Sequence, residues 1–287
     1  MTHSRRQLLE LLDESGITLS RALGQNFVAD PNTVRRIVRL AGVQPGDAVV
    51  ELGAGIGSLT LALAEAGARV VAVETDRHVV PLLRRLVSDL DVTVVQADAL
   101  QLGWVEALTP PGSSWAMVSN LPYNIAVPLV LDVLAGVPAV TSMLVMVQRE
   151  VAERLASGPG SKVYGIPSVK RAWWADATVV AKVPATVFIP VPRVESALLR
   201  LVRRPPPPTA LTAAAVFKVV ETAFGQRRKM LRRSLAVYPS FEAAAAVAGV
   251  RSDCRPEELG LEQWVRLAEQ LLLPGSSAPP LAGPTGL

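Results

Sequence analysis

Cysteine and histidine are scarce in this chain of 287 residues. The single cysteine, Cys254, cannot form an intramolecular disulfide, which fits a reducing compartment. The two histidines, His3 and His78, are far apart in the sequence. We therefore expect no disulfide framework and no metal centre, and we find no Ser/His/Asp or Cys/His pattern of a hydrolase.

Long apolar runs are also missing. The most apolar stretch, residues 129–147, contains Asp132 and the break Gly136-Val137-Pro138, which favour a helix, a turn and a buried strand over a membrane span. The N-terminus MTHSRRQLLELLDESG has no sustained apolar segment, so it does not resemble a secretory signal. With 50% hydrophobic residues, we expect a cytoplasmic globular protein that has one large and one smaller domain.

The net positive charge is small, but the positive residues are unevenly distributed along the chain. The net charge is +4, yet the segment GQRRKMLRR contains Arg227, Arg228, Lys229, Arg232 and Arg233 without an acidic residue. An unbroken basic run favours a polyanionic partner such as RNA or DNA, and a solubilising surface is the alternative.

Short β-branched runs alternate with helical patterns between residues 48 and 147. This alternation predicts an α/β fold with a mostly parallel sheet, and the neighbouring runs ATVVAKV and SALLRLV predict an antiparallel end to it. The proline run RRPPPP predicts a boundary between a first domain, residues 1–204, and a helical domain, residues 205–272. The tail, residues 273–287, has no core-forming pattern and is expected to be disordered.

Three features follow successive predicted strands. The first is the turn ELGAGIGSLT, in which Gly53, Gly55 and Gly57 let a ligand approach the backbone and the start of a helix. The others are Glu74, spaced as an acid that holds ribose hydroxyls, and Asp98, which could accept from an adenine amino group. Each alone has an ordinary alternative: a tight turn, a strand end or a helix cap. Together they predict a nucleoside-binding edge of the sheet.

Eight segments extend this pattern over most of the chain: LGQNFVAD, ELGAGIGSLT, VETD, QADAL, SNLPYNIAVPLV, VQREVAERLASGPGSKVYG, VFIPVPRVESALLRL and FGQRRKMLRRSL. In this order they resemble the rRNA adenine N6,N6-dimethyltransferase family, and PGSKVYG and FGQRRK resemble its small-subunit branch. The resemblance implies a class I S-adenosylmethionine-dependent methyltransferase fold, Rossmann-like with a mostly parallel seven-stranded sheet, an N-terminal helical arm and a small all-α C-terminal domain.

The resemblance also implies a reaction. Methyl groups pass from S-adenosylmethionine, which leaves as S-adenosylhomocysteine, to N6 of two adjacent adenines near the 3′ end of small-subunit (16S) rRNA. We expect a monomer that acts on the small ribosomal subunit, without a metal and without a membrane. Two alternatives stay open: a large-subunit (23S) rRNA adenine dimethyltransferase, and an RNA-binding ribosome assembly factor.

Site residues are carried over from the matching motifs. We expect the Asn120 side-chain oxygen and the Leu121 carbonyl to accept the two N6 hydrogens, with Pro122 stiffening the turn. Tyr123 and Phe188 would flank the flipped base, although Phe188 could instead be a core aromatic. The implied cofactor-binding residues are Asn26, Val28, Gly53, Gly55, Glu74, Asp98 and Asn120, and the implied RNA-binding residues are Lys162, Arg227, Arg228 and Lys229.

Some positions carry an alternative or depart from the family pattern. Residues 158–165 are expected to form a mobile loop beside the base pocket, or else a surface hairpin. One of the three cations at 227–229 could instead pair with an acid such as Glu221. Val28, Ala54 and Ser119 stand where the family usually has Leu, Pro and Gly, and none of these changes removes a required group.

Overall fold

The structure is a computed structural model that describes residues 2–18, 25–109 and 114–273. The chain divides into two compact units, one of Met1–Ala156 and Trp174–Arg204 and one of Ser157–Trp173 and Pro205–Leu287. The second unit thus includes residues 157–173, which the sequence-based boundaries place in the first domain. Except for Leu273, the predicted tail lies outside the described residues.

The described part of the first unit is built on a seven-stranded sheet of order β4-β3-β2-β5-β6-β9-β7. Strands β4, β3, β2, β5 and β6 are parallel, and β9 is antiparallel to both β6 and β7. This confirms the predicted mostly parallel sheet and its antiparallel end. The strands are β2 (Ala48–Leu52), β3 (Arg69–Glu74), β4 (Val92–Gln96), β5 (Trp115–Asn120), β6 (Val140–Gln148), β7 (Ala175–Val183) and β9 (Ser196–Arg203).

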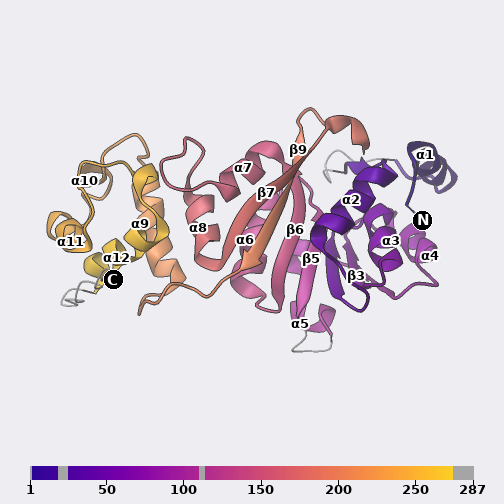
Figure 1. The fold of residues 1–287 in the computed structure, drawn as a ribbon, viewed down its shortest axis with the longest axis horizontal. Coiled ribbons are helices and arrows are strands. Elements are labelled where there is room, and N and C mark those ends of the chain that lie inside the picture. Colours follow the sequence, from indigo (N-terminus) through magenta and orange to yellow (C-terminus); the bar gives the residue numbers. More distant parts are fainter. Residues whose placement is uncertain (1, 19–24, 110–113, 274–287) are drawn as a thin grey trace, which may run out of the picture. The chain divides into compact units, whose positions relative to one another are not determined.

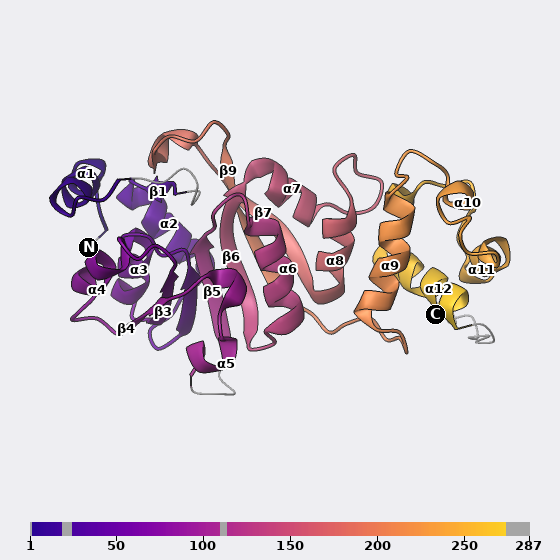
Figure 2. The ribbon, with the colours of Figure 1, turned by 180° about the vertical axis from the view of Figure 1, so that it is seen from behind.

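Helices cover both faces of this sheet (Figure 1, Figure 2). Side chains of α2, α3 and α4 share one apolar core with alternate strand residues such as Val49, whereas α5, α6 and α7 pack on the other face with Val50 and Leu52. The helical elements are α2 (Pro31–Ala41), α3 (Ser58–Glu65), α4 (Val80–Leu86), η1 (Ala99–Gln101), α5 (Trp104–Ala107), α6 (Ala126–Gly136), α7 (Arg149–Ala156) and η2 (Ala185–Val187).

A second, two-stranded sheet joins segments far apart in the sequence. Strand β1 (Phe27–Val28) pairs antiparallel with β8 (Phe188–Ile189). Helix α1 (Arg5–Glu14) packs two buried leucines against this pair. The Arg5 guanidinium also donates hydrogen bonds of 2.8 and 3.0 Å to backbone carbonyls beside and within β8. These contacts fix the segment after residue 25 next to the glycine turn.

The described part of the second unit is helical. Apolar residues on one side of α9, among them Val216 and Val220, are fully buried, and Phe224 packs against Trp264 with ring centroids 6.1 Å apart. Its elements are α8 (Ile166–Trp174), α9 (Ala213–Phe224), α10 (Leu231–Ser234), α11 (Phe241–Ala248), η3 (Pro256–Glu258) and α12 (Leu261–Leu272). Within the described ranges, no helix of either unit combines the length and the apolar content needed to cross a membrane.

Candidate active site

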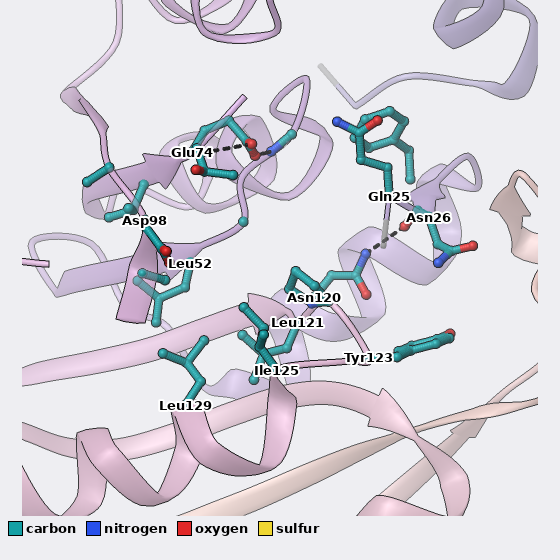
Figure 3. A pocket seen from close by; sticks show the side chains of 18 residues that line it. Gln25, Asn26, Leu52, Glu74, Asp98, Asn120, Leu121, Tyr123, Ile125 and Leu129 are labelled. Atoms are coloured by element: carbon teal, nitrogen blue, oxygen red, sulfur yellow. Dashed lines mark hydrogen bonds between the residues drawn. The ribbon is translucent and has the colours of Figure 1, made fainter. Parts of the chain in front are cut away.

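A cleft that is open to solvent lies at the carboxyl ends of β2, β3, β4 and β5 (Figure 3). The strand order reverses between β2 and β5, since β3 and β4 continue on one side of β2 and β6 on the other side of β5. Loops on the two sides of such a reversal diverge and leave a crevice, which is where open α/β sheets bind ligands. The cleft therefore arises from the topology of the sheet.

The glycine turn forms one wall of the cleft. Gly53 and Gly55 have φ angles of +74° and +56°, a region that residues with a side chain rarely adopt. A Cβ atom on Gly53 would lie 3.4 Å from the Pro122 ring, and one on Gly55 would lie 2.4 Å from the Phe27 ring. Backbone conformation thus favours glycine at both positions, and close packing against Phe27 also requires it at Gly55. Both glycines leave backbone atoms at the surface of the cleft.

Two acids stand at the ends of the neighbouring strands. The Glu74 carboxylate is buried and accepts hydrogen bonds from the N–H groups of Gly55 (2.7 Å), Thr75 and Asp76 (both 2.9 Å). Burial raises the pKa of Glu74, while these backbone donors act against that rise. Asp98 is exposed and accepts from the Leu100 N–H at 3.0 Å, so it also caps the turn that follows β4.

Asn120 is held by the segment that precedes β1. Its amide nitrogen donates to the Asn26 carbonyl at 2.9 Å. Because a carbonyl can only accept, the nitrogen must face Asn26, and the amide oxygen turns toward the side on which Tyr123 lies (Figure 3). The structure therefore presents an oriented acceptor inside the cleft.

The residues after Asn120 form a short fixed turn. The Leu121 N–H donates to the Met146 carbonyl on β6 at 3.1 Å, and the Pro122 carbonyl accepts from Ile125 at 3.2 Å. Tyr123 lines the cleft, and its hydroxyl lies 2.6 Å from that of Ser196. The unusual sequence SNLPY is thus explained: the proline ring packs against Gly53, and the amide and the aromatic ring project from a rigid turn.

Two of the predicted catalytic and cofactor-binding residues, Phe188 and Val28, lie outside the set of described residues that line the cleft. Phe188 is fully buried in the core cluster that also contains Met146 and Leu198, because its strand, β8, is pulled inward by pairing with β1. Val28 lines a smaller neighbouring pocket, together with Glu51 and Asn120. The stacking role of Phe188 and the cofactor contact of Val28 stay predictions.

The predicted RNA-binding residues all lie in the second unit, where one of them is engaged internally. The Arg227 guanidinium forms an ion pair with Glu257 at 2.7 Å and donates to the Lys162 carbonyl at 2.6 Å. Arg228, Lys229 and the Lys162 side chain are exposed. The expected pairing of one cation with an acid is thus observed, but the acid is Glu257, because Glu221 pairs with Lys170 at 2.7 Å.

The segment 158–165 is also fastened within the second unit. The Gly160 N–H donates to the Glu257 carbonyl at 2.7 Å, and the Tyr164 hydroxyl donates to the Leu259 carbonyl at 2.9 Å. Together with the Arg227 contact, these hydrogen bonds join the segment to η3 and the residues after it. The segment belongs to the helical unit, and its place beside the base pocket stays a prediction.

Several residues that shape the site were not among those predicted from the sequence. Phe27 covers the glycine turn, Ser119 accepts from the Leu52 N–H at 2.9 Å where β2 and β5 separate, and Ser196 meets Tyr123. Glu51 is a further such residue, and its burial could have been predicted from the sequence, because strand alternation places this acid on the same face as the buried Val49. The others depend on contacts between segments distant in sequence.

Glu51 is fully buried, and the Thr60 hydroxyl donates a hydrogen bond of 2.6 Å to its carboxyl group. Burial raises the pKa of this carboxyl from 4.5 to about 8, the Thr60 bond lowers it, and Glu74 adds to the rise. The folded protein therefore holds a proton that the unfolded chain releases above about pH 4.5.

We expect Glu51→Gln to flatten the pH dependence of stability. The wild-type protein should lose stability as pH rises from about 4.5 to about 8, because Glu51 binds a proton only in the folded state. The slope has an upper limit of about 1.4 kcal/mol per pH unit. Melting temperatures from pH 5 to 9 measure it. Glu14→Gln, an exposed acid in α1, is the control, and parallel curves for wild type and Glu51→Gln would refute the assignment.

The cleft residues fit an adenosine-type cofactor with an amino-acid tail. Bare backbone at Gly53 and Gly55 admits close approach, and acids at two strand ends can accept from ribose and base. Apolar side chains such as Leu129 form the remaining wall. Among the described residues, no group of three or more His, Cys, Asp or Glu side chains is arranged to hold a metal ion.

Comparison with known proteins identifies the family. The model of the ribosomal RNA adenine dimethylase family matches residues 17–272. A protein of Kineococcus radiotolerans named ribosomal RNA small subunit methyltransferase A is 49% identical over 274 residues, which cover 92% of this chain and 90% of that protein. Its namesake in Thermobifida fusca is 48% identical over 269 residues, covering 90% and 92%.

Solved structures agree in fold. The 23S rRNA methyltransferase ErmE has a TM-score of 0.65 and 32% identity, with 85% of this chain and 99% of that chain covered. A dimethyladenosine transferase from Plasmodium falciparum has a TM-score of 0.68 at 21% identity, covering 83% and 94%, and supports the fold alone. The predicted fold class and enzyme class, an S-adenosylmethionine-dependent rRNA methyltransferase, are thereby confirmed. The chain belongs to the ribosomal RNA adenine dimethylase family.

Proposed function

We propose that this protein transfers methyl groups from S-adenosylmethionine to N6 of two adjacent adenines near the 3′ end of small-subunit rRNA. The relatives with 48–49% identity bear a small-subunit name, which favours this substrate over the large subunit. The observation that carries the chemistry is the orientation of Asn120, whose amide oxygen is turned into the cleft by the bond to Asn26. We further propose that the protein acts in the cytoplasm as a monomer.

Residues on three strand ends would hold the cofactor. Backbone at Gly53 and Gly55 would face its amino-acid part, Glu74 its ribose hydroxyls and Asp98 its adenine amino group. Glu74 already accepts three backbone hydrogen bonds, and a carboxylate has about four acceptor positions, so it has room for a further donor. When bound, the cofactor supplies an electrophilic methyl group on a sulfonium.

Asn120 and its neighbours would prepare the nucleophile. The N6 lone pair of adenine is delocalised into the ring, which makes this amine a poor nucleophile. If the Asn120 oxygen and the Leu121 carbonyl accept its two hydrogens, the nitrogen becomes more tetrahedral and its lone pair turns toward the methyl group. Tyr123 would fix the plane of the flipped base by stacking. Positioning accounts for most of the rate enhancement in this mechanism.

Transfer of labelled methyl groups tests the proposal. Unmethylated small subunits, large subunits and protein-free rRNA are incubated with the protein and labelled S-adenosylmethionine, and nucleosides are then separated. We expect dimethyladenosine in small-subunit RNA alone. Label in large-subunit RNA would show that the substrate is 23S rRNA, as the name of ErmE states for that enzyme. Binding of the cofactor without any methyl transfer would favour an RNA-binding assembly factor.

The exposed cations of the second unit would contact RNA phosphates, which orient the substrate without reading its sequence. The Arg227 guanidinium already binds Glu257 and the Lys162 carbonyl, so we propose that Arg227 holds the segment 158–165 in place. We assign the phosphate contacts to Arg228 and Lys229. The positive side chains of Arg232 and Arg233 on α10 extend the same exposed stretch.

This division predicts different salt dependences. Replacing Arg228 and Lys229 together by Gln should make the plot of log K against log salt shallower by roughly 1.5, because each lost phosphate contact changes the slope by about 0.7 to 0.9. Arg227→Gln should leave the slope near that of the wild type and lower the melting temperature. Binding of rRNA at several salt concentrations measures this, with Lys182→Gln in the first unit as control. Equal slopes for all variants would contradict the assignment.

A further inference from the structure

The phenol of Tyr123 is held by a residue of a distant strand. Its hydroxyl lies 2.6 Å from the hydroxyl of Ser196, which stands 73 positions later in the chain. Ser196 is fully buried. It is the first residue of β9, and because β9 is antiparallel to β6, it lies at the edge of the sheet where β6 ends.

The backbone of Ser196 is fixed on both sides. It pairs with Gln148 on β6 and with Val183 on β7, so its hydroxyl projects from a strand that has neighbours in both directions. An anchor of this kind cannot shift without disturbing the sheet. The hydrogen bond therefore ties the hydroxyl end of the Tyr123 side chain to a strand that is paired on both sides.

A stacking surface needs a fixed orientation before the base arrives. The Tyr side chain has two rotatable bonds and a rigid ring, and a hydrogen bond at its hydroxyl fixes where the far end of the ring lies, which restrains rotation about the Cα–Cβ bond. Because the hydroxyl oxygen lies on the axis of the second rotation, the bond restrains the plane of the ring only through the preference of a phenol for hydrogen bonds in the plane of its ring. Burial raises the pKa of Tyr123, and the hydrogen bond with Ser196 acts against that rise. The hydroxyl is engaged by Ser196 while the side chain still lines the cleft.

We infer that Ser196 is a positioning residue, which holds the Tyr123 ring in the place where the target adenine stacks on it. The inference rests on the proposed stacking role of Tyr123. The start of β9, through Ser196, would then contribute to the reaction together with the ends of β2, β3, β4 and β5, which form the cleft. Without Ser196 the ring would still be present but its far end would be free to swing away, and the base would be held less often in line with the methyl group.

Four variants test the inference by single-turnover methyl transfer to unmethylated small subunits at saturating S-adenosylmethionine. Ser196→Ala and Tyr123→Phe should each lower the rate by about 3- to 10-fold, the range expected for one lost hydrogen bond. The double variant should be no slower than the slower single variant, because both changes remove the same bond. Ser196→Thr keeps a hydroxyl and should recover most of the rate. Cofactor affinity, measured by titration, should stay within roughly twofold in all four.

A matched control removes a similar bond elsewhere. The hydroxyls of Ser114 and Thr141 lie 2.7 Å apart at the opposite edge of the same sheet, so Ser114→Ala should leave the rate unchanged. A wild-type rate in Ser196→Ala, multiplicative effects in the double variant, or loss of cofactor affinity without rescue by Thr would each overturn the inference. Tyr123→Ala tests the stacking role of Tyr123 separately from the positioning role of Ser196. An unchanged rate in that variant would refute the stacking role, and the role of Ser196 with it.

Discussion

Asn120→Ala is expected to lower the rate of methyl transfer by about 100- to 1,000-fold, the range seen when one oriented polar group that acts on the reacting centre is removed. The change deletes the acceptor for N6 and also the bond that holds Asn120 to the Asn26 carbonyl. The cofactor wall formed by Gly53, Gly55 and Glu74 stays in place. We therefore expect the affinity for S-adenosylmethionine to change by less than about tenfold.

Rates at saturating cofactor and RNA, together with cofactor titration, measure both effects. Asn32→Ala serves as the control, since Asn32 is exposed on α2 and lies outside the residues that line the cleft. Methyl transfer by Asn120→Ala at the wild-type rate would remove Asn120 from the reaction. Equal losses of rate and of cofactor affinity would instead mark it as a part of the cofactor site.

Gly55→Ala is expected to abolish cofactor binding, with a loss of at least about 100-fold in affinity. The new Cβ would lie 2.4 Å from Phe27 Cε1 at a φ of +56°, so either the Phe27 ring or the glycine turn has to move. Movement of the turn also breaks the 2.7 Å bond from the Gly55 N–H to Glu74 and leaves a buried carboxylate short of a donor. Cofactor titration and thermal melting measure the two consequences.

The effect of packing can be separated from that of backbone strain. Gly42→Ala imposes a similar left-handed conformation, with a φ of +73°, but the described atoms leave the space around its Cβ open. It should lower stability and leave cofactor affinity unchanged. The double variant Phe27→Ala, Gly55→Ala makes room for the new methyl group and should regain part of the affinity. No difference between Gly42→Ala and Gly55→Ala would show that packing by Phe27 is irrelevant.

The fold was largely predictable because its signals are local. Alternation of β-branched and helical runs, glycines after a strand and a proline run are each visible within about ten residues. The helix, turn and strand expected within residues 129–147 correspond to α6 and β6. The carboxyl ends of parallel strands meet at one edge, so the grouping of Gly53, Glu74, Asp98 and Asn120 in one cleft also follows from sequence order.

What could not be predicted depends on partners distant in the chain. The sequence identifies Arg227 as a cation but cannot indicate that Glu257 and the Lys162 carbonyl occupy it. It presents Phe188 as an aromatic in a motif, whereas pairing of its strand with β1 buries the ring. Likewise, Ser119 and Ser196 are ordinary serines until the sheet brings them to Leu52 and Tyr123. Local patterns determine elements, and tertiary contacts determine which groups remain available.

The pairing of β1 with β8 has a consequence for biosynthesis. Phe27 and Val28 emerge early from the ribosome, but their partners, Ile189 and Phe188, are about 160 residues further on. The covering of the glycine turn and the anchor for Tyr123 both wait for the segment from residue 186 to residue 196. A nascent chain that already contains the ends of β2, β3, β4 and β5 therefore still lacks β8, which pairs with β1, and Ser196, which contacts Tyr123. Competence to react should arise late, after β8 and β9 have joined their sheets.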